Sequence, residues 1–166
     1  MPRHALRSML LTLGCLAVVA ALVQPAAAQP SPLTFGVRAG ETFHARAAFL
    51  GVELLVPLGH GWKLDPNAEV ALVNPGHLVT GNLDLSYEIS AAGPFRLWAG
   101  GGPAIVFRQL AVKDVHGEAL ATAHTDAGLN LLAGIGLRRQ RLLPYLQAKV
   151  LLSNTNEYVL AFGVRF

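Results

Sequence analysis

The sequence predicts an all-β protein: a closed eight-stranded antiparallel up-and-down transmembrane β-barrel that follows a cleaved signal peptide. Two observations carry this prediction. The chain begins with a basic, then apolar, then small-residue segment, which is typical of an export signal. After it, apolar and polar residues alternate with a period of two over segments of about 10 residues, with turn residues between them.

The N-terminal segment has the three parts of a signal peptide. Arg3 and Arg7 precede the charge-free stretch 9–23, and Ala26-Ala27-Ala28 offers the small residues that a signal peptidase accepts. The apolar stretch is shorter than the roughly 20 residues of a membrane-spanning helix, which disfavours an uncleaved anchor. We therefore expect residues 1–28 to be removed by cleavage before Gln29.

Residues 29–166 have a length that suits one domain, an outer-membrane β-barrel. The only cysteine of the chain, Cys15, lies in the predicted signal peptide, and Thr12 stands where a lipoprotein signal normally carries leucine. The predicted mature part thus has no thiol chemistry. Of the 13 basic residues, two lie in the signal peptide, and the remaining basic residues nearly balance the 10 acidic ones. This balance disfavours a nucleic-acid partner.

Eight strands are expected, and residues typical of turns separate them. The expected strands are Leu33–Gly40, Arg46–Val56, Trp62–Asn74, Leu78–Ile89, Phe95–Arg108, Thr125–Arg138, Leu142–Leu152 and Glu157–Phe166. Only Gln109–His124 is expected to form a long connection.

The two faces of each strand differ in size and charge. In the last strand, Phe162 and its neighbours two positions away are apolar or aromatic, whereas Gly163 and Arg165 share the other face. Glycine suits the crowded interior of a narrow barrel, whereas a soluble lipocalin-like ligand-binding barrel, the periplasmic alternative, would turn its apolar face inward. We therefore predict a lipid-facing apolar surface and inward-facing charges. The expected lumen charges are Arg38, Glu53, Glu69, Asp84, Glu88, Arg96, Lys149 and Arg165.

Aromatic residues near the strand ends are expected to form two belts at the membrane interfaces. They are Phe35, Tyr87, Phe95, Phe107, Tyr158 and Phe166. Because eight strands leave an interior that side chains can fill, the lumen charges are expected to pair and to plug the barrel. A narrow pore is the alternative.

The chain resembles the small opacity and OmpA-type outer-membrane barrels. The resemblance rests on the signal peptide, the eight short strands, the segment Pro144-Tyr145-Leu146-Gln147-Ala148 and a last strand that ends in Phe166. It implies location in the cell outer membrane, contact with outer-membrane lipid or lipopolysaccharide, and transient recognition of the terminal strand by the barrel assembly machinery. Those families often carry long surface loops, whereas here only Gln109–His124 is long.

Catalysis is not expected. Some eight-stranded barrels deacylate lipid A with a His-x-Ser-Asn motif, which Leu151-Leu152-Ser153-Asn154 matches except at the histidine. A serine without a neighbouring base is a poor nucleophile. His44, His77, His116 and His124 fall in or beside outward connections, none of them is expected on a strand, and no pair has metal-ligand spacing.

The expected function is therefore non-enzymatic, structural or a surface interaction, with no cofactor and no metal. If the role is an interaction, Gln109–His124 is the expected contact surface. It carries Lys113, Asp114, His116 and Glu118, which can engage a polar partner or lipopolysaccharide.

Overall fold

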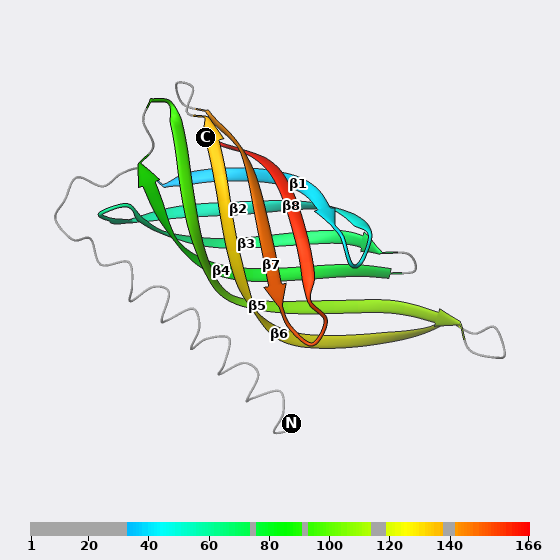
Figure 1. Ribbon diagram of the computed structural model, residues 1–166. Coiled ribbons are helices and arrows are strands. Elements are labelled where there is room, and N and C mark those ends of the chain that lie inside the picture. Colours follow the sequence, from blue (N-terminus) through cyan, green and yellow to red (C-terminus); the bar gives the residue numbers. More distant parts are fainter. Residues whose placement is uncertain (1–32, 74–75, 91–92, 114–118, 138–141) are drawn as a thin grey trace. The chain divides into compact units, whose positions relative to one another are not determined.

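The computed structural model describes residues 33–73, 76–90, 93–113, 119–137 and 142–166 (Figure 1). These residues form eight antiparallel strands that close into a barrel in sequence order. The strands are β1 (Thr34–Thr42), β2 (Ala47–Gly59), β3 (Trp62–Val73), β4 (Gly76–Ser90), β5 (Phe95–Lys113), β6 (Ala119–Leu137), β7 (Leu143–Leu152) and β8 (Glu157–Arg165). The expected fold class is confirmed. The predicted signal peptide lies outside the described residues.

The barrel closes where the first strand meets the last. β1 pairs with β8 from Gly36 opposite Arg165 to Thr42 opposite Val159. Phe35 and Phe166 exchange two backbone hydrogen bonds of 3.2 and 2.9 Å, which continue this seam to the chain end. Closure gives each strand a partner on both sides, as lipid requires, because backbone groups cannot bond to water there.

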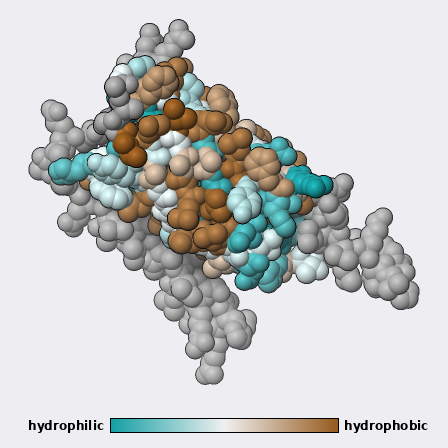
Figure 2. Space-filling model, in the orientation of Figure 1, coloured by the Kyte–Doolittle hydropathy of each residue, from teal (hydrophilic) through white to brown (hydrophobic). Residues whose placement is uncertain are grey.

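Side chains alternate between the interior and the outer surface along every strand. In β8, Val159, Ala161 and Arg165 are buried, whereas Tyr158 and Phe162 are exposed. Outward leucines reach high exposed fractions, 72% for Leu50 and 79% for Leu72. Figure 2 shows hydrophobic residues over much of the middle of the visible face of the barrel. A surface of this kind is unfavourable in water and favourable in a hydrocarbon solvent. No helix among the described residues has the length and apolar character needed to cross a membrane.

A short turn connects β2 to β3 at the end of the barrel where β1 begins and β8 ends, which we call the terminus-bearing rim. Between β2 and β3, Gly59, His60 and Gly61 all have positive φ, of 93°, 52° and 85°. Glycine adopts this backbone region without a steric penalty. The turn is anchored to β4 because Glu88 donates a 2.8 Å backbone hydrogen bond to the carbonyl of Gly61.

The expectation of a long connection over Gln109–His124 is wrong. β5 continues to Lys113 and β6 begins at Ala119, so most of this segment is a paired hairpin. Both strands extend past their other neighbours, as Figure 1 shows: β4 meets β5 only as far as Leu110. The hairpin was hidden because alanine-rich sequence with few β-branched residues carries a weak strand signal.

Candidate functional site

The barrel interior holds most of the charged groups that the sequence placed there. Arg38, Glu53, Glu69, Asp84, Lys149 and Arg165 are all buried, with exposed fractions of 0–5%. They come from β1, β2, β3, β4, β7 and β8, so the strand alternation brings residues from distant parts of the sequence into one cluster. Buried charges are tolerated only when they are paired and hydrogen-bonded.

One group of ion pairs joins four strands across the lumen. Arg38 lies 3.0 Å from Glu69 and 3.6 Å from Glu53. Lys149 lies 2.6 Å from the other carboxylate oxygen of Glu69, which also accepts a hydrogen bond from Thr80. Glu69 therefore neutralises two cations at once and links β1 to β7.

Arg165, the penultimate residue of the chain, occupies a site built by three other strands. Its guanidinium donates to both carboxylate oxygens of Glu53, at 2.7 and 3.2 Å. The same group lies 4.6 Å from the ring centroid of Trp98 and 4.4 Å from that of Tyr145, so it makes two cation–π contacts. Trp98 is held in place by a 3.0 Å hydrogen bond to Gln147. Arg165 thus ties the last strand to the interior.

Amide side chains fill the space between the ion pairs. Asn67 accepts a hydrogen bond from Arg38 and donates to Asp84, while Asn82 donates to Asn67 at 2.7 Å. Asn130 donates to Asp84 at 3.0 Å and to Asn82 at 2.8 Å. This chain of amides carries hydrogen bonds from β1 through β3 and β4 to β6.

Glu88 and Arg96 belong to a second, smaller cluster. Glu88 contacts Lys63 and lies 3.4 Å from Arg96, and all three side chains are 20–27% exposed. Lys63, Glu88 and Arg96 stand near the ends of β3, β4 and β5 that adjoin the terminus-bearing rim. The eight predicted charges are therefore divided between a buried network and this partly solvated group.

Several residues of the polar interior were not predicted from the sequence. The structure adds Lys63, Asp65, Asn67, Asn82, Trp98, Asn130, Tyr145 and Gln147 to the polar interior. A usable signal was present in β3, where Asp65, Asn67 and Glu69 recur at every second position. The asparagines carry no charge, so a prediction based on charged residues omits them.

The interior toward the opposite rim contains an apolar cluster. Its buried cluster is Ala47, Phe49, Ala71, Leu78, Ala104, Val106, Leu151, Val159 and Ala161. Val106 is completely buried. The lumen is thus filled by a polar network toward the end of β8 and, toward the other end, by this apolar cluster together with the buried side chains of Thr42, Asp126 and Glu157.

The predicted belt residues all lie on the outer surface, with exposed fractions of 43–58%. Phe35, Tyr87, Phe95 and Phe166 stand near the terminus-bearing rim. Phe107 and Tyr158 stand toward the other end. Trp62, which the prediction omitted, joins the first group and packs edge-on against Tyr87 with ring centroids 5.2 Å apart.

Two histidines lie on strands, contrary to expectation: His77 is in β4 and His124 is in β6. His124 Nε2 lies 2.9 Å from Asp126 Oδ1, which also accepts a 2.7 Å hydrogen bond from Asn154. Ser153 donates instead to the carbonyl of Thr155, at 2.7 Å. Among the described residues, no cluster of three or more His, Cys, Asp or Glu side chains could hold a metal ion.

Known structures share this barrel at low sequence identity. The N-terminal β-barrel domain of OprF from Pseudomonas aeruginosa is 15% identical, with a TM-score of 0.69 over 81% of this chain and 95% of that one. Neisserial surface protein A (NspA) is 12% identical, with a TM-score of 0.62 over 80% and 94%. A transmembrane β-barrel designed de novo is 14% identical, with a TM-score of 0.54 over 84% and 97%.

No protein-family model matches the sequence, and the search of curated proteins finds no match. The structural matches nevertheless show that the chain has the fold of the small transmembrane β-barrels, which confirms the expected resemblance at the level of fold. The likeness extends to a designed barrel. The fold by itself thus carries no particular activity.

Proposed function

We propose that this protein is a non-enzymatic integral protein of the outer membrane whose plugged barrel serves as a structural, non-conducting scaffold. The observation that carries the proposal is the combination of an apolar outer surface with a buried, paired charge network. Leu50 and Leu72 face outward at the same time as Arg38 and Arg165 face inward. This arrangement suits a hydrocarbon solvent and does not suit water.

The plugged lumen is supported by the contacts inside it. The ion pairs around Glu69 and Glu53 cross the interior, and the apolar cluster around Val106 follows them. An ion would have to break these pairs and pass this cluster, and both steps are unfavourable. The barrel should show no stable stepwise conductance in planar lipid bilayers. Well-defined channels would instead favour the narrow pore.

Membrane placement can be tested on the purified full-length mature chain. It should require detergent and migrate faster on a gel before heating than after heating. A monodisperse chain in plain buffer would contradict the proposal and favour a soluble, lipocalin-like binding barrel. The expected lipid partners are outer-membrane lipid and lipopolysaccharide, and the strand that ends in Phe166 is the expected contact for the barrel assembly machinery.

The non-enzymatic assignment is supported by the bonding of the one suggestive serine. Ser153 bonds to Thr155, and His124 is engaged by Asp126. Within the described residues no hydrogen bond joins Ser153 to a histidine, and a nucleophile needs such a base. Incubation with lipopolysaccharide or model esters should release no fatty acid. Release that disappears in both Ser153→Ala and His124→Ala would overturn the assignment.

A surface interaction is the second candidate, and one feature of the hairpin favours it. Pairing between β6 and β7 begins only at Leu129, so in the described part of the chain residues 119–128 have a strand partner on the β5 side alone. A free strand edge is a site where a partner can add by backbone hydrogen bonds. Lipopolysaccharide or another polar partner could contact the same part of the β5–β6 hairpin, which extends past the neighbouring strands. Replacing residues 109–123 by a short turn should abolish lipopolysaccharide binding and preserve heat-modifiable mobility. Unchanged binding would contradict this candidate.

A further inference from the structure

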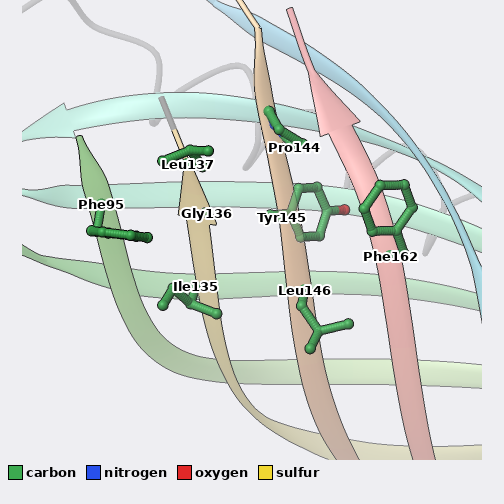
Figure 3. A pocket seen from close by; sticks show the side chains of 8 residues that line it. All are labelled: Phe95, Ile135, Gly136, Leu137, Pro144, Tyr145, Leu146 and Phe162. Carbon is green, nitrogen blue, oxygen red and sulfur yellow. The ribbon is translucent and has the colours of Figure 1, made fainter. Parts of the chain in front are cut away.

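The outer surface of the barrel has a groove near the rim that carries the termini. It has a volume of about 270 Å³ and lies over the ends of β5, β6, β7 and β8 (Figure 3). The side chains that border it are Phe95, Ile135, Leu137, Pro144, Leu146 and Phe162. All of them are hydrocarbon, so the groove offers no polar side chain to a ligand at its border.

The groove arises where two neighbouring strands separate. The pairing of β6 with β7 ends at Gly136 opposite Tyr145, one position before β6 itself ends. Pro144, the next residue on β7, has no backbone N–H with which to extend the ladder. Gly136 has no side chain, and Tyr145 is 2% exposed with its ring beneath Arg165 in the interior. The floor of the groove is therefore barrel wall.

The walls of the groove stand clear of the barrel. Phe95 on one side is 47% exposed, and Leu146 and Phe162 on the other are 47% and 59% exposed. Leu137 is the last residue of β6 and Phe95 the first of β5, so the groove lies beside the rim. Lipid headgroups lie at this level if the barrel spans a bilayer.

We propose that this groove binds one acyl chain of a membrane phospholipid from the leaflet that surrounds the terminus-bearing rim. The inference rests on the proposed function, because lipid covers the outward face only in a membrane. The groove is continuous with the apolar outer surface, where hydrocarbon chains are the available solvent. A chain that lies between Phe95 and Phe162 contacts apolar groups on three sides, whereas a chain on the smooth wall contacts them on one.

The test uses the mature barrel in phospholipid nanodiscs that contain a small fraction of a phospholipid with a diazirine in its acyl chain. After irradiation, labelled peptides are mapped by mass spectrometry. Peptides that carry Leu137 and Leu146 should be labelled several-fold more than those that carry the outward residues Leu50 and Leu72. Native mass spectrometry of detergent-exchanged protein should retain one phospholipid.

Two variants and a matched control connect the labelling to the groove. Leu146→Trp fills the groove and should abolish both the excess labelling and the retained lipid. Phe162→Ala removes one wall and should also lower both. Leu152→Trp places the same side chain on the same outward face of β7 beyond the groove, and it should leave both unchanged. Heat-modifiable mobility identifies any variant that does not fold.

The possible failures are distinguishable. Uniform labelling of the whole outer surface would contradict acyl-chain binding in the groove and leave the proposed membrane placement intact. Absence of labelling from every peptide would overturn the membrane placement itself. Cross-links between two barrels at Leu146 or Phe162, with no retained lipid, would contradict the proposal and show that a second copy of this protein occupies the groove.

Discussion

Asp65 on β3 and Asp84 on β4 are direct cross-strand partners, and both side chains are buried in the barrel interior. Their surroundings differ. Asp65 lies 3.8 Å from Arg165, and its Oδ1 has no hydrogen-bond partner in the described part of the chain. Asp84 accepts hydrogen bonds from Asn67 and Asn130, at 2.9 and 3.0 Å. Like charges in opposite positions destabilise a sheet, so this pair is a weak point of the network.

The Asp65→Asn variant should therefore keep or raise the free energy of unfolding, by up to about 1 kcal/mol. The substitution removes the like charge opposite Asp84 and gives up only a long ion pair with Arg165. Equilibrium unfolding by urea, in detergent micelles or lipid vesicles, measures the effect.

Glu53→Gln is the matched comparison for Asp65→Asn. It removes the carboxylate that Arg165 binds through two hydrogen bonds and one of the two carboxylates beside Arg38, so it should lose about 3–5 kcal/mol. A comparable loss in Asp65→Asn would show that the aspartate, too, is an essential member of the network.

Arg165→Lys should lower the free energy of unfolding by about 2 kcal/mol although the charge is preserved. An ammonium cannot donate in the bidentate geometry that Glu53 accepts, and it has no flat surface to stack between Trp98 and Tyr145. Urea unfolding followed by tryptophan fluorescence, in a Trp62→Phe background where Trp98 is the only tryptophan, measures both the stability and the environment of Trp98.

Arg96→Lys provides the control for charge-preserving replacement. Arg96 is partly solvated and makes one 3.4 Å contact with Glu88, so the change should stay within about 1 kcal/mol. Equal losses in the two lysine variants would mean that the aromatic site around Arg165 contributes nothing beyond its charge.

The sequence predicts the fold well because the relevant signal is local. A period of two assigns Gly163 and Arg165 to one face and Phe162 to the other without any knowledge of the neighbours. The turn residues between the alternating segments then limit the number of strands. Closure into a barrel follows, because an open edge is incompatible with lipid.

The contacts inside the barrel could not be predicted in the same way. Which acid faces Arg165 depends on the stagger of strands that are far apart in sequence, and Glu53 is 112 positions away. The role of Trp98 was equally hidden, because its space exists only where Gly134 on the adjacent strand lacks a side chain. The extent of β5 and β6 was missed because alanine is a weak strand former.

Gly163→Ala should cost about 1–3 kcal/mol, because interior space at this position is already occupied. Tyr145 is the cross-strand partner of Gly163, and an added Cβ would overlap its ring, much closer than van der Waals contact allows. The ring cannot retreat because Arg165 stacks against it. The cost is measured by urea unfolding.

Gly81→Ala tests the same substitution on the outer surface. An added Cβ at Gly81 meets no atom within 4 Å, so stability should be unchanged or rise by about 0.5 kcal/mol through the lower entropy of the unfolded chain. If both alanine variants change stability by the same amount, the interior at Gly163 is not tightly packed.

Leu50→Arg should cost about 2–4 kcal/mol when the barrel folds into phospholipid vesicles, the cost of a cation at the bilayer midplane. Leu50 faces outward and pairs with Ala39, which lies midway along β1 between the levels of Phe35 and Phe43. Leu58, near the turn between β2 and β3, is outward as well but close to the rim, and Leu58→Arg should cost only about 0–1 kcal/mol. The two variants add the same charge to the same strand, so the difference between them reports depth alone. Urea titrations in one lipid composition measure both. Equal costs would mean that the apolar band is not centred on Leu50, and a negligible cost at Leu50 would mean that this face does not meet lipid.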